Sequence, residues 1–263
     1  MPATVLIMID GLRPEPLLNN PERYPNLSSF RSRSSWTLSA SSIMPSTTLP
    51  CHMSIFHSVP PSRHCVTSNT WVPMEEPIPG LFEISYEAGL HTAIFYTWEP
   101  LRNISRLGHL SYSFFIDEKY NLLHGDEMIM NEAVRYLENY SHDFLFVYFG
   151  TVDTVGHDHG WMTEKYFEQI EIIDGLVGSL FKVLPSDPTV LVQADHGGHD
   201  FDHGISLLED MTVPWMISGP GIRRDYQIKS AVSLLETAPT LARVLGIDPH
   251  PEWLGHCIDE IFE

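Results

Sequence analysis

The chain is 263 residues long, which is enough for one domain to bury a full hydrophobic core, and we expect a single domain over residues 1–263. Its formal net charge of −19, from 34 acidic and 15 basic residues, argues against a groove that follows the phosphates of polymeric nucleic acid. No apolar stretch approaches the ~20 residues of a membrane span, and no basic and apolar leader follows Met1. The three cysteines include no Cys-x-x-Cys pair and provide no disulfide framework. We therefore expect a cytoplasmic protein without membrane contact.

Short apolar runs alternate with stretches of helical periodicity along most of the chain. The apolar runs predict strands over residues 5–9, 36–39, 92–96, 112–116, 144–149, 189–193 and 214–218. The periodic stretches predict helices over residues 26–32, 48–57, 80–88, 125–140, 163–183 and 233–245. Strands that are separated by helices predict an α/β fold, here a three-layer αβα sandwich with a mostly parallel sheet.

Carboxylates follow two of the predicted strands. The run 5–9 ends in Asp10-Gly11, and the run 144–149 leads to Asp153 and His157. The last two residues are four apart, so a helical turn after the strand would place both side chains on one face. Burying a carboxylate at a strand end is costly without a cation or hydrogen bonds, and metal binding therefore explains these positions better than packing does.

The densest group of metal-binding side chains follows the predicted strand 189–193. Residues 194–204 read ADHGGHDFDHG and hold three histidines and three aspartates within eleven positions. Imidazole and carboxylate together suit zinc or manganese, and in open α/β sheets ligands bind beyond the carboxyl ends of the strands. We therefore expect this segment and the two other strand ends to share one metal site.

Residues 44–52, MPSTTLPCH, contain the candidate nucleophile and complete a set of ordered motifs. The set consists of Asp10-Gly11, Thr48-Leu49-Pro50, Asp153-x-x-x-His157 and Asp195-His196-Gly197. In this order the motifs resemble those of the alkaline phosphatase superfamily, and within it the type I phosphodiesterase/nucleotide pyrophosphatase branch, whose Thr-Phe-Pro-Asn segment carries the nucleophile. The resemblance runs through essentially the whole chain and implies an alkaline-phosphatase-like fold and a single catalytic domain over residues 1–263.

The resemblance also implies two divalent metal ions, with zinc expected and manganese as the alternative. One ion would be held by Asp10, Thr48, Asp195 and His196. The other would be held by Asp153, His157 and a third histidine. His203, in a His-Gly pair downstream of Asp-His-Gly, is the best match for this third ligand, with His199 as its competitor and His256 as a weaker rival.

Thr48 is the expected nucleophile because it stands one residue before Leu-Pro, as in the family, and Thr47 is the alternative. A threonine hydroxyl is a poor nucleophile until a divalent cation lowers its pKa. Attack on phosphorus would give a phospho-threonine or nucleotidyl-threonine, which water then hydrolyses. The expected substrate is a small phosphodiester or nucleotide.

Substrate contacts are predicted at Asn69 and Cys51. Cys51 stands where eukaryotic-type members of the family have an asparagine that donates to a phosphoryl oxygen. A thiol is a much weaker donor. Backbone N–H groups at the start of the helix after Thr48 are therefore the alternative donors to the phosphoryl oxygen. His52 is expected to pack behind the site.

Two further functions stay open beside the phosphodiesterase. One is a phosphomonoesterase or phosphomutase of the same superfamily, and the other is a binding protein that has lost catalysis. Sulfatase chemistry is disfavoured because the sequence has no Cys-x-Pro-x-Arg motif. The oligomeric state does not follow from the sequence.

Overall fold

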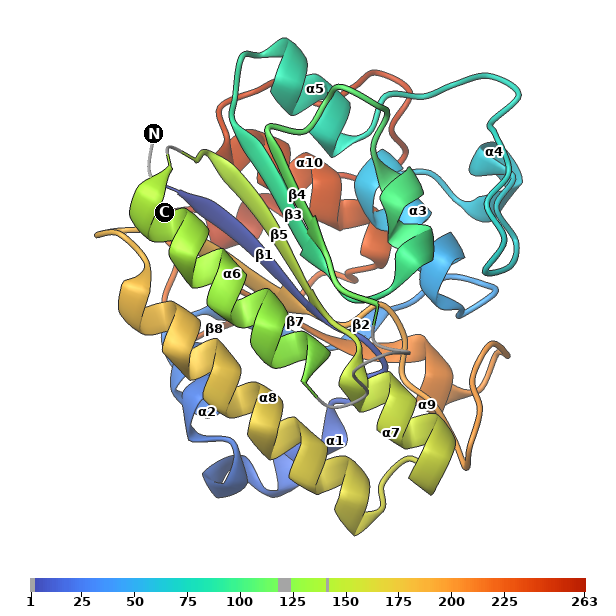
Figure 1. Cartoon of the computed structure of the whole chain (residues 1–263), viewed down its shortest axis with the longest axis vertical. Coiled ribbons are helices and arrows are strands. Elements are labelled where there is room, and N and C mark those ends of the chain that lie inside the picture. Colours follow the sequence, from blue (N-terminus) through green and yellow to red (C-terminus); the bar gives the residue numbers. More distant parts are fainter. Residues whose placement is uncertain (1–2, 118–123, 141) are drawn as a thin grey trace.

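The computed structural model describes residues 3–117, 124–140 and 142–263. Within these residues, eight strands form one sheet in the order β4-β3-β5-β1-β6-β7-β2-β8 (Figure 1). The strands are β1 Thr4–Ile9, β2 Ser35–Ser41, β3 Thr92–Tyr96, β4 Tyr112–Phe115, β5 Phe144–Phe149, β6 Thr189–Gln193, β7 Thr212–Ser218 and β8 Tyr226–Gln227. β7 is antiparallel to both of its neighbours, and the other pairs are parallel.

Helices cover both faces of this sheet. The helices α2, α6 and α8 pack on one face, and α3, α5 and α10 pack on the other (Figure 1). The α-helices are α1 Glu15–Asn19, α2 Pro25–Arg31, α3 Thr48–His57, α4 Pro61–His64, α5 Leu81–Glu87, α6 Gly125–Asn139, α7 Thr151–His159, α8 Glu164–Val183, α9 Leu208–Met211 and α10 Thr237–Val244. Short 3₁₀ helices are η1 Pro21–Arg23, η2 Glu99–Ile104, η4 Leu234–Glu236 and η5 Asp259–Ile261. The arrangement confirms the predicted three-layer sandwich with a mostly parallel sheet.

The structure contains every predicted strand and helix, with small shifts at their ends, and differs from the prediction in three respects. The last predicted helix is divided into η4 and α10, because Ser233 and Glu236 form a capping box that closes a 3₁₀ turn first. The two-residue strand β8 and the helices α1, α4, α7 and α9 were not among the predicted elements, since short elements carry little periodicity, although a helical turn at α7 was considered. The direction of β7 was also not predicted, because direction depends on pairing with distant strands.

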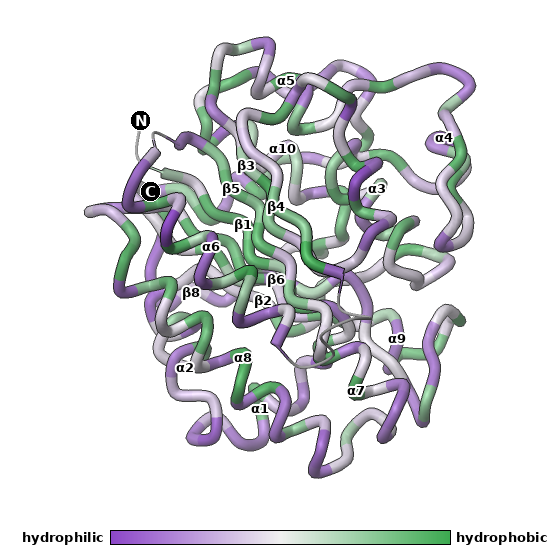
Figure 2. Tube along the Cα trace, in the orientation of Figure 1, coloured by the Kyte–Doolittle hydropathy of each residue, from purple (hydrophilic) through white to green (hydrophobic). Residues whose placement is uncertain are grey.

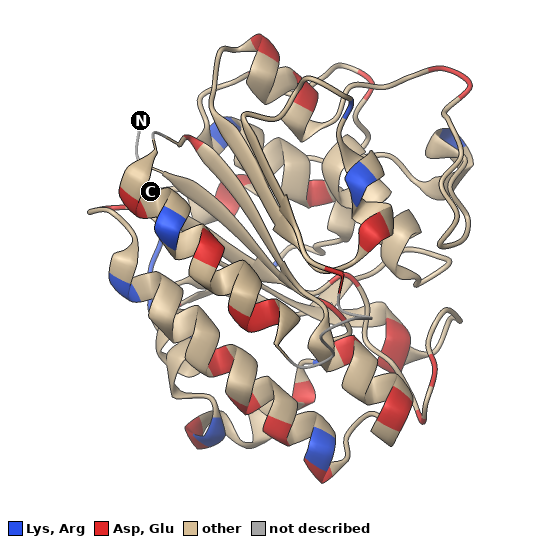
Figure 3. Ribbon diagram, viewed as in Figure 1, with Lys and Arg blue, Asp and Glu red and all other residues tan. Residues whose placement is uncertain are grey.

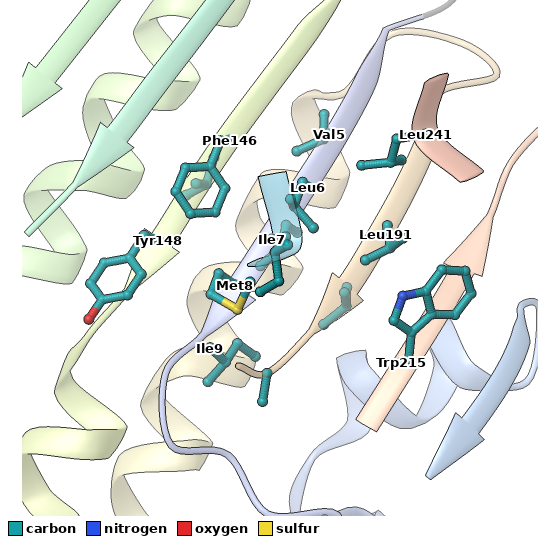
Figure 4. Packing of buried hydrophobic residues seen from close by; sticks show 14 of the residues in the cluster. Val5, Leu6, Ile7, Met8, Ile9, Phe146, Tyr148, Leu191, Trp215 and Leu241 are labelled. Atoms are coloured by element: carbon teal, nitrogen blue, oxygen red, sulfur yellow. The ribbon is translucent and has the colours of Figure 1, made fainter. Parts of the chain in front are cut away.

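The central strand β1 explains why the strand sequences are apolar without alternation. It lies between β5 and β6, and its side chains Val5 to Ile9 are fully buried (Figure 4). A parallel strand with helices on both faces has no solvent side, so both sets of its side chains enter the core. Figure 2 shows this apolar centre surrounded by hydrophilic segments.

The strand order sets the position of the polar motifs. β5, β1 and β6 are adjacent and parallel, so their carboxyl ends meet at one edge of the sheet. β2 runs in the same direction, because two antiparallel pairings through β7 separate it from β6. The segments that follow these four strands, and acidic residues among them, therefore gather at one end of the sheet (Figure 3).

Among the helices of the described ranges, none is both long enough and apolar enough to cross a bilayer.

Candidate functional site

Three side chains that directly follow β1 and β6 form a buried group, here called the inner cluster: Asp10, Asp195 and His196. Each offers a ligand atom within 4.8 Å of the others. Nε2 of His196 lies 3.2 Å from Oδ1 of Asp10 and 3.5 Å from Oδ2 of Asp195. All three side chains are at most 1% exposed.

Two glycines make the approach of these segments possible. Gly11 has a φ of +69°, and a Cβ there would lie 3.0 Å from the Cα of Asp153. A Cβ on Gly197 would collide with the backbone oxygen of Glu209. The glycines of the Asp-Gly and Asp-His-Gly motifs are thus explained by close packing of the chain around the inner cluster.

Thr48 begins α3 beside the inner cluster. Its Oγ1 lies 3.2 Å from Nε2 of His196, and the side chain is buried. The preceding residue, Thr47, is the N-cap of α3 and its side chain makes no capping hydrogen bond. Of the two threonines, the structure therefore brings Thr48 to the inner cluster.

A second group, the outer cluster, consists of Asp153 and His157 of α7 together with His203. Asp153 and His203 each also offer a ligand atom within 4.8 Å of one on His196, whereas His157 joins the group through Asp153 and through its ring, 5.0 Å from that of His203. Oδ2 of Asp153 lies 3.5 Å from Nε2 of His157, and Oδ1 of Asp153 lies 3.6 Å from Nε2 of His203. The ring of His203 stacks on that of His196 at 3.8 Å, which joins the two clusters. The helix α7 directly follows β5 and so supplies the condition under which the four-residue spacing places Asp153 and His157 on one face.

The histidines of both clusters present the same nitrogen to the carboxylates. Nδ1 of His196, His157 and His203 donates to the backbone oxygens of Gly197, Phe201 and Ser46, at 2.8, 2.9 and 2.8 Å. A carbonyl oxygen can only accept, so in the neutral form of each ring it is Nε2 that carries the lone pair for coordination. This arrangement is typical of metal-binding histidines.

The two rival histidines lie elsewhere. Nδ1 of His199 bonds to Oδ1 of Asp210 at 2.7 Å, and the ring belongs to neither cluster. His256 is exposed near the C-terminus and also lies in neither cluster. The geometry therefore groups His203, rather than His199 or His256, with Asp153 and His157.

The electrostatics of the clusters suit a cation. Burial and then the charges of Asp10 and Asp153 raise the pKa of Asp195 well above its usual value. Burial lowers the pKa of His196 to about 3. Burial, and then the neighbouring His196, lowers the pKa of His203 to about 4, so both rings are neutral at physiological pH. Oδ1 of Asp10 and Oδ2 of Asp195 are buried, and within the described residues they have no hydrogen-bond partner.

A pocket of about 260 Å³ opens over both clusters. Its lining includes Thr48, Asn69, Trp98 and Tyr148 beside the outer cluster. Asn69 is exposed there, and its Oδ1 accepts from the backbone N–H of Leu49 at 3.0 Å. A separate and more apolar pocket of about 160 Å³ is lined by Met53, His57, residues 71–74, 77, 78 and 83, and residues 103–106, and it includes no member of either cluster.

Cys51 does not fit the predicted substrate contact. Its side chain is fully buried, it is not part of the pocket lining, and its Sγ lies 3.4 Å from Oγ of Ser42. The physical reason is the turn of α3, which directs position 51 into the core instead of towards the pocket. His52 is fully buried, and its Nδ1 lies 2.8 Å from the backbone oxygen of Thr48, as expected for a residue packed behind the site.

Two residues at the site were not predicted. The hydroxyl of Tyr148 donates to Oδ2 of Asp10, and a single hydroxyl in an otherwise hydrocarbon strand was the available signal. Asp126 of α6 accepts from the backbone N–H groups of Gly150 and Thr151 at 3.2 and 3.1 Å and so caps α7, which carries Asp153 and His157. A cap supplied by a distant segment leaves no local sequence signal.

Comparisons with solved structures agree with this fold. Human ectonucleotide pyrophosphatase/phosphodiesterase 5 is 13% identical with a TM-score of 0.83, covering 99% of this chain and 100% of that one. The inactive threonine-to-alanine variant of the mouse protein, in complex with AMP, is 12% identical with a TM-score of 0.81 and full coverage, 100% of each chain. Phosphonate monoester hydrolase of Agrobacterium radiobacter is 14% identical with a TM-score of 0.79, covering 100% of this chain and 77% of that one. At these identities the likeness is one of fold alone.

Sequence comparison gives a partial match and a broad one. The 2,3-bisphosphoglycerate-independent phosphoglycerate mutase of Clostridium perfringens (strain SM101) is 27% identical over 140 residues, which is 49% of this chain and 26% of that enzyme. The mutase of Pseudomonas fluorescens (strain Pf0-1) is 27% identical over 137 residues, again 49% and 26%. The matched region thus spans about a quarter of these relatives.

The family model described as type I phosphodiesterase / nucleotide pyrophosphatase matches residues 4–89 and 82–223. Because this match spans most of the chain and includes both clusters and Thr48, the chain belongs to the type I phosphodiesterase/nucleotide pyrophosphatase family.

Proposed function

We propose that this protein is a metal-dependent hydrolase of small phosphodiesters or nucleotides, with Thr48 as the nucleophile and with residues 1–263 acting as one catalytic domain. The observation that carries the proposal is the position of Thr48, whose Oγ1 lies 3.2 Å from Nε2 of His196 in the inner cluster. The hydroxyl thereby faces the same centre as two buried carboxylates.

The residues fit two divalent cations. Asp10, Thr48, Asp195 and His196 would hold one ion, and Asp153, His157 and His203 the other. Two buried carboxylate oxygens have no hydrogen-bond partner among the described residues, and they lie next to neutral imidazoles. Burying such a set of donor atoms costs free energy unless a cation binds there. Mixed imidazole and carboxylate ligands favour zinc, with manganese as the alternative.

Bound divalent ions would lower the pKa of the threonine hydroxyl and stabilise negative charge on the oxygens of the transferred phosphoryl group. Thr48 Oγ1, having lost its proton to solvent, would attack phosphorus; the bond from phosphorus to the leaving oxygen would break, and that oxygen would leave with the electron pair and take up a proton from solvent. The product is a phospho-threonine or nucleotidyl-threonine at position 48. Attack of water on phosphorus releases the second product and restores the hydroxyl.

The pocket lining supports a diester with a group that can stack. Among the described residues, the pocket lining includes no lysine or arginine, the side chains that would meet the second negative charge of a monoester. The side-chain NH₂ of Asn69 would contact a phosphoryl oxygen, and Trp98 offers an aromatic surface at the rim. Near the start of α3, the N–H of Leu49 already bonds to Asn69 and that of Cys51 to Thr47, and Pro50 has none, so the backbone donor proposed there is the N–H of Thr48. The AMP bound by the mouse relative is consistent with a nucleotide, although that relative is similar in fold alone.

A phosphomonoesterase or phosphomutase is the second candidate, because the sequence match to the phosphoglycerate mutases favours it. It would use the same nucleophile and ligands. It stands behind the diesterase because the described pocket lining offers no lysine or arginine for the extra charge of a monoester.

Steady-state rates on two substrates test the proposal. The metal-loaded protein is assayed on bis(p-nitrophenyl) phosphate and on p-nitrophenyl phosphate, and we expect a higher kcat/KM for the diester. A strong preference for the monoester would favour the second candidate. Failure to turn over either substrate, with the metals bound, would count against hydrolysis of phosphate esters.

A further inference from the structure

Tyr148 is a buried tyrosine in a strand that otherwise consists of hydrocarbon side chains. β5 reads FLFVYF, and the Tyr148 side chain, like its phenylalanine neighbours, is almost completely buried (Figure 4). Its ring meets the edge of the His52 ring at 5.5 Å, a contact that phenylalanine would make equally well. Packing therefore explains the ring of Tyr148 and leaves the hydroxyl to be explained.

The hydroxyl is directed to one oxygen of the inner cluster. Met8 of β1 is paired with Tyr148 of β5, so the carboxylate of Asp10, two residues further on, lies within reach of the phenol. The hydroxyl donates to Oδ2 of Asp10. Tyr148 also lines the pocket over the clusters, so this hydrogen bond forms part of the site.

The two oxygens of Asp10 consequently differ. Oδ2 accepts from Tyr148, whereas Oδ1 is buried, has no hydrogen-bond partner among the described residues and lies 3.2 Å from Nε2 of His196. A carboxylate with two equivalent oxygens can bind a cation through either oxygen or through both. Here one oxygen is already engaged and the other faces the centre.

We propose that Tyr148 is a positioning residue that engages Oδ2 of Asp10 and leaves Oδ1 as the single oxygen directed at the inner metal ion. The inference rests on the proposed two-metal function. Hydrogen bonds to a ligand from outside the coordination sphere orient it before the ion binds, and their loss commonly weakens metal affinity 10- to 100-fold. Tyr148 thus acts through Asp10 and does not need to contact the substrate.

The substitution Tyr148→Phe removes the hydroxyl and keeps the ring. Zn²⁺ alone is titrated into the metal-free protein against a competing chromophoric chelator, and we expect a Kd for the tighter ion that is about 10 to 100 times weaker. The matched control is Tyr24→Phe, because Tyr24 is fully buried and its hydroxyl has no hydrogen-bond partner among the described residues. This control should leave the zinc Kd unchanged, and near-ultraviolet circular dichroism of each metal-free variant checks that the ring packing is kept.

A double-mutant cycle separates positioning from a general loss of structure. In an Asp10→Ala background, Tyr148→Phe should change the zinc Kd little, since position 10 then offers no oxygen for the hydroxyl to orient. The same loss in both backgrounds would contradict action through Asp10. If the unmodified protein does not bind zinc or manganese, the proposed function fails. If it binds zinc and Tyr148→Phe binds equally well, only the role of Tyr148 fails.

Discussion

The inner and outer clusters are built from different parts of the fold, and they differ in burial. The residues of the inner cluster stand within three positions of a strand end and are at most 1% exposed. The outer cluster is carried by α7 and by the loop before α9, and the His157 side chain is 39% exposed. The comparison indicates that the sheet itself prepares the inner site, whereas the outer site depends on a helix and a loop.

This difference suggests a division of work. The inner cluster lies beside Thr48, so in the proposed mechanism it would stabilise the attacking oxygen, and the more open outer cluster would serve the leaving group and water. An ion in the outer cluster should also exchange more readily. Four predictions test or refine this comparison.

The largest effect is expected at the inner cluster. Thr48→Ala removes the attacking oxygen and should reduce kcat on the order of 10⁴-fold or more, with metal content measured by elemental analysis largely unchanged. Thr48→Ser keeps the oxygen and should retain measurable activity. Thr47→Ala is the control, since that side chain makes no capping hydrogen bond. Near-normal turnover by Thr48→Ala, or a trapped adduct that mass spectrometry locates on Thr47, would contradict the assignment.

Substitution in the outer cluster should cost less. His203→Ala is expected to lower the metal content from two equivalents to one and to reduce kcat roughly 10²- to 10³-fold, on the scale of a lost electrostatic or acid–base contribution. The matched change His199→Ala should be milder, because His199 bonds to Asp210 outside both clusters. The reverse ranking of the two variants would move the third ligand to His199.

The neutrality of buried histidines can be tested at His64, which lies outside both clusters. Burial lowers its pKa to about 4, so the unfolded chain takes up a proton near pH 6.5 and the folded chain does not. Stability should therefore fall as the pH drops from about 6.5 towards 4, by on the order of 1 to 3 kcal/mol from this residue.

Urea unfolding of the metal-free protein at pH 7.5 and pH 5 measures this contribution. The variant His64→Gln is expected to lose less stability between the two pH values than the unmodified protein. Its absolute stability should also be lower, because His64 bonds to the Val66 N–H at 3.1 Å and lies 3.0 Å from Oγ of Ser54. Parallel pH dependence in both proteins would argue against a neutral His64.

The smallest effect on activity is expected at Cys51. Its thiol is fully buried behind the inner cluster, and burial raises its pKa well above the usual value, so it is neither a substrate contact nor a nucleophile in this geometry. Cys51→Ala should leave kcat/KM within about threefold and cost about 1 kcal/mol of stability, as expected for a small cavity. A loss of kcat/KM comparable to that of His203→Ala would restore a functional role.

Much of the site was predictable because its residues stand at fixed distances from local patterns. The apolar runs before Asp10 and Asp195 predict buried strands, and the four-residue spacing of Asp153 and His157 predicts a shared helical face. The start of α3 at Thr48 was likewise predicted, together with the segment that carries the nucleophile. These features depend on neighbouring residues, whose periodicity is visible in the sequence.

Other features depended on contacts between distant segments, and these only the tertiary structure could decide. The strand order β5-β1-β6 brings Asp153, Asp10 and Asp195 together, although up to 185 residues separate them along the chain. The direction of each Nδ1 distinguishes His203 from His199, because the accepting carbonyl of Ser46 comes from another part of the chain. The burial of Cys51 and the bond from Tyr148 to Asp10 follow in the same way from packing between elements. The sequence by itself thus determined the chemical types and the local elements, and the pairing of strands determined which of those residues meet.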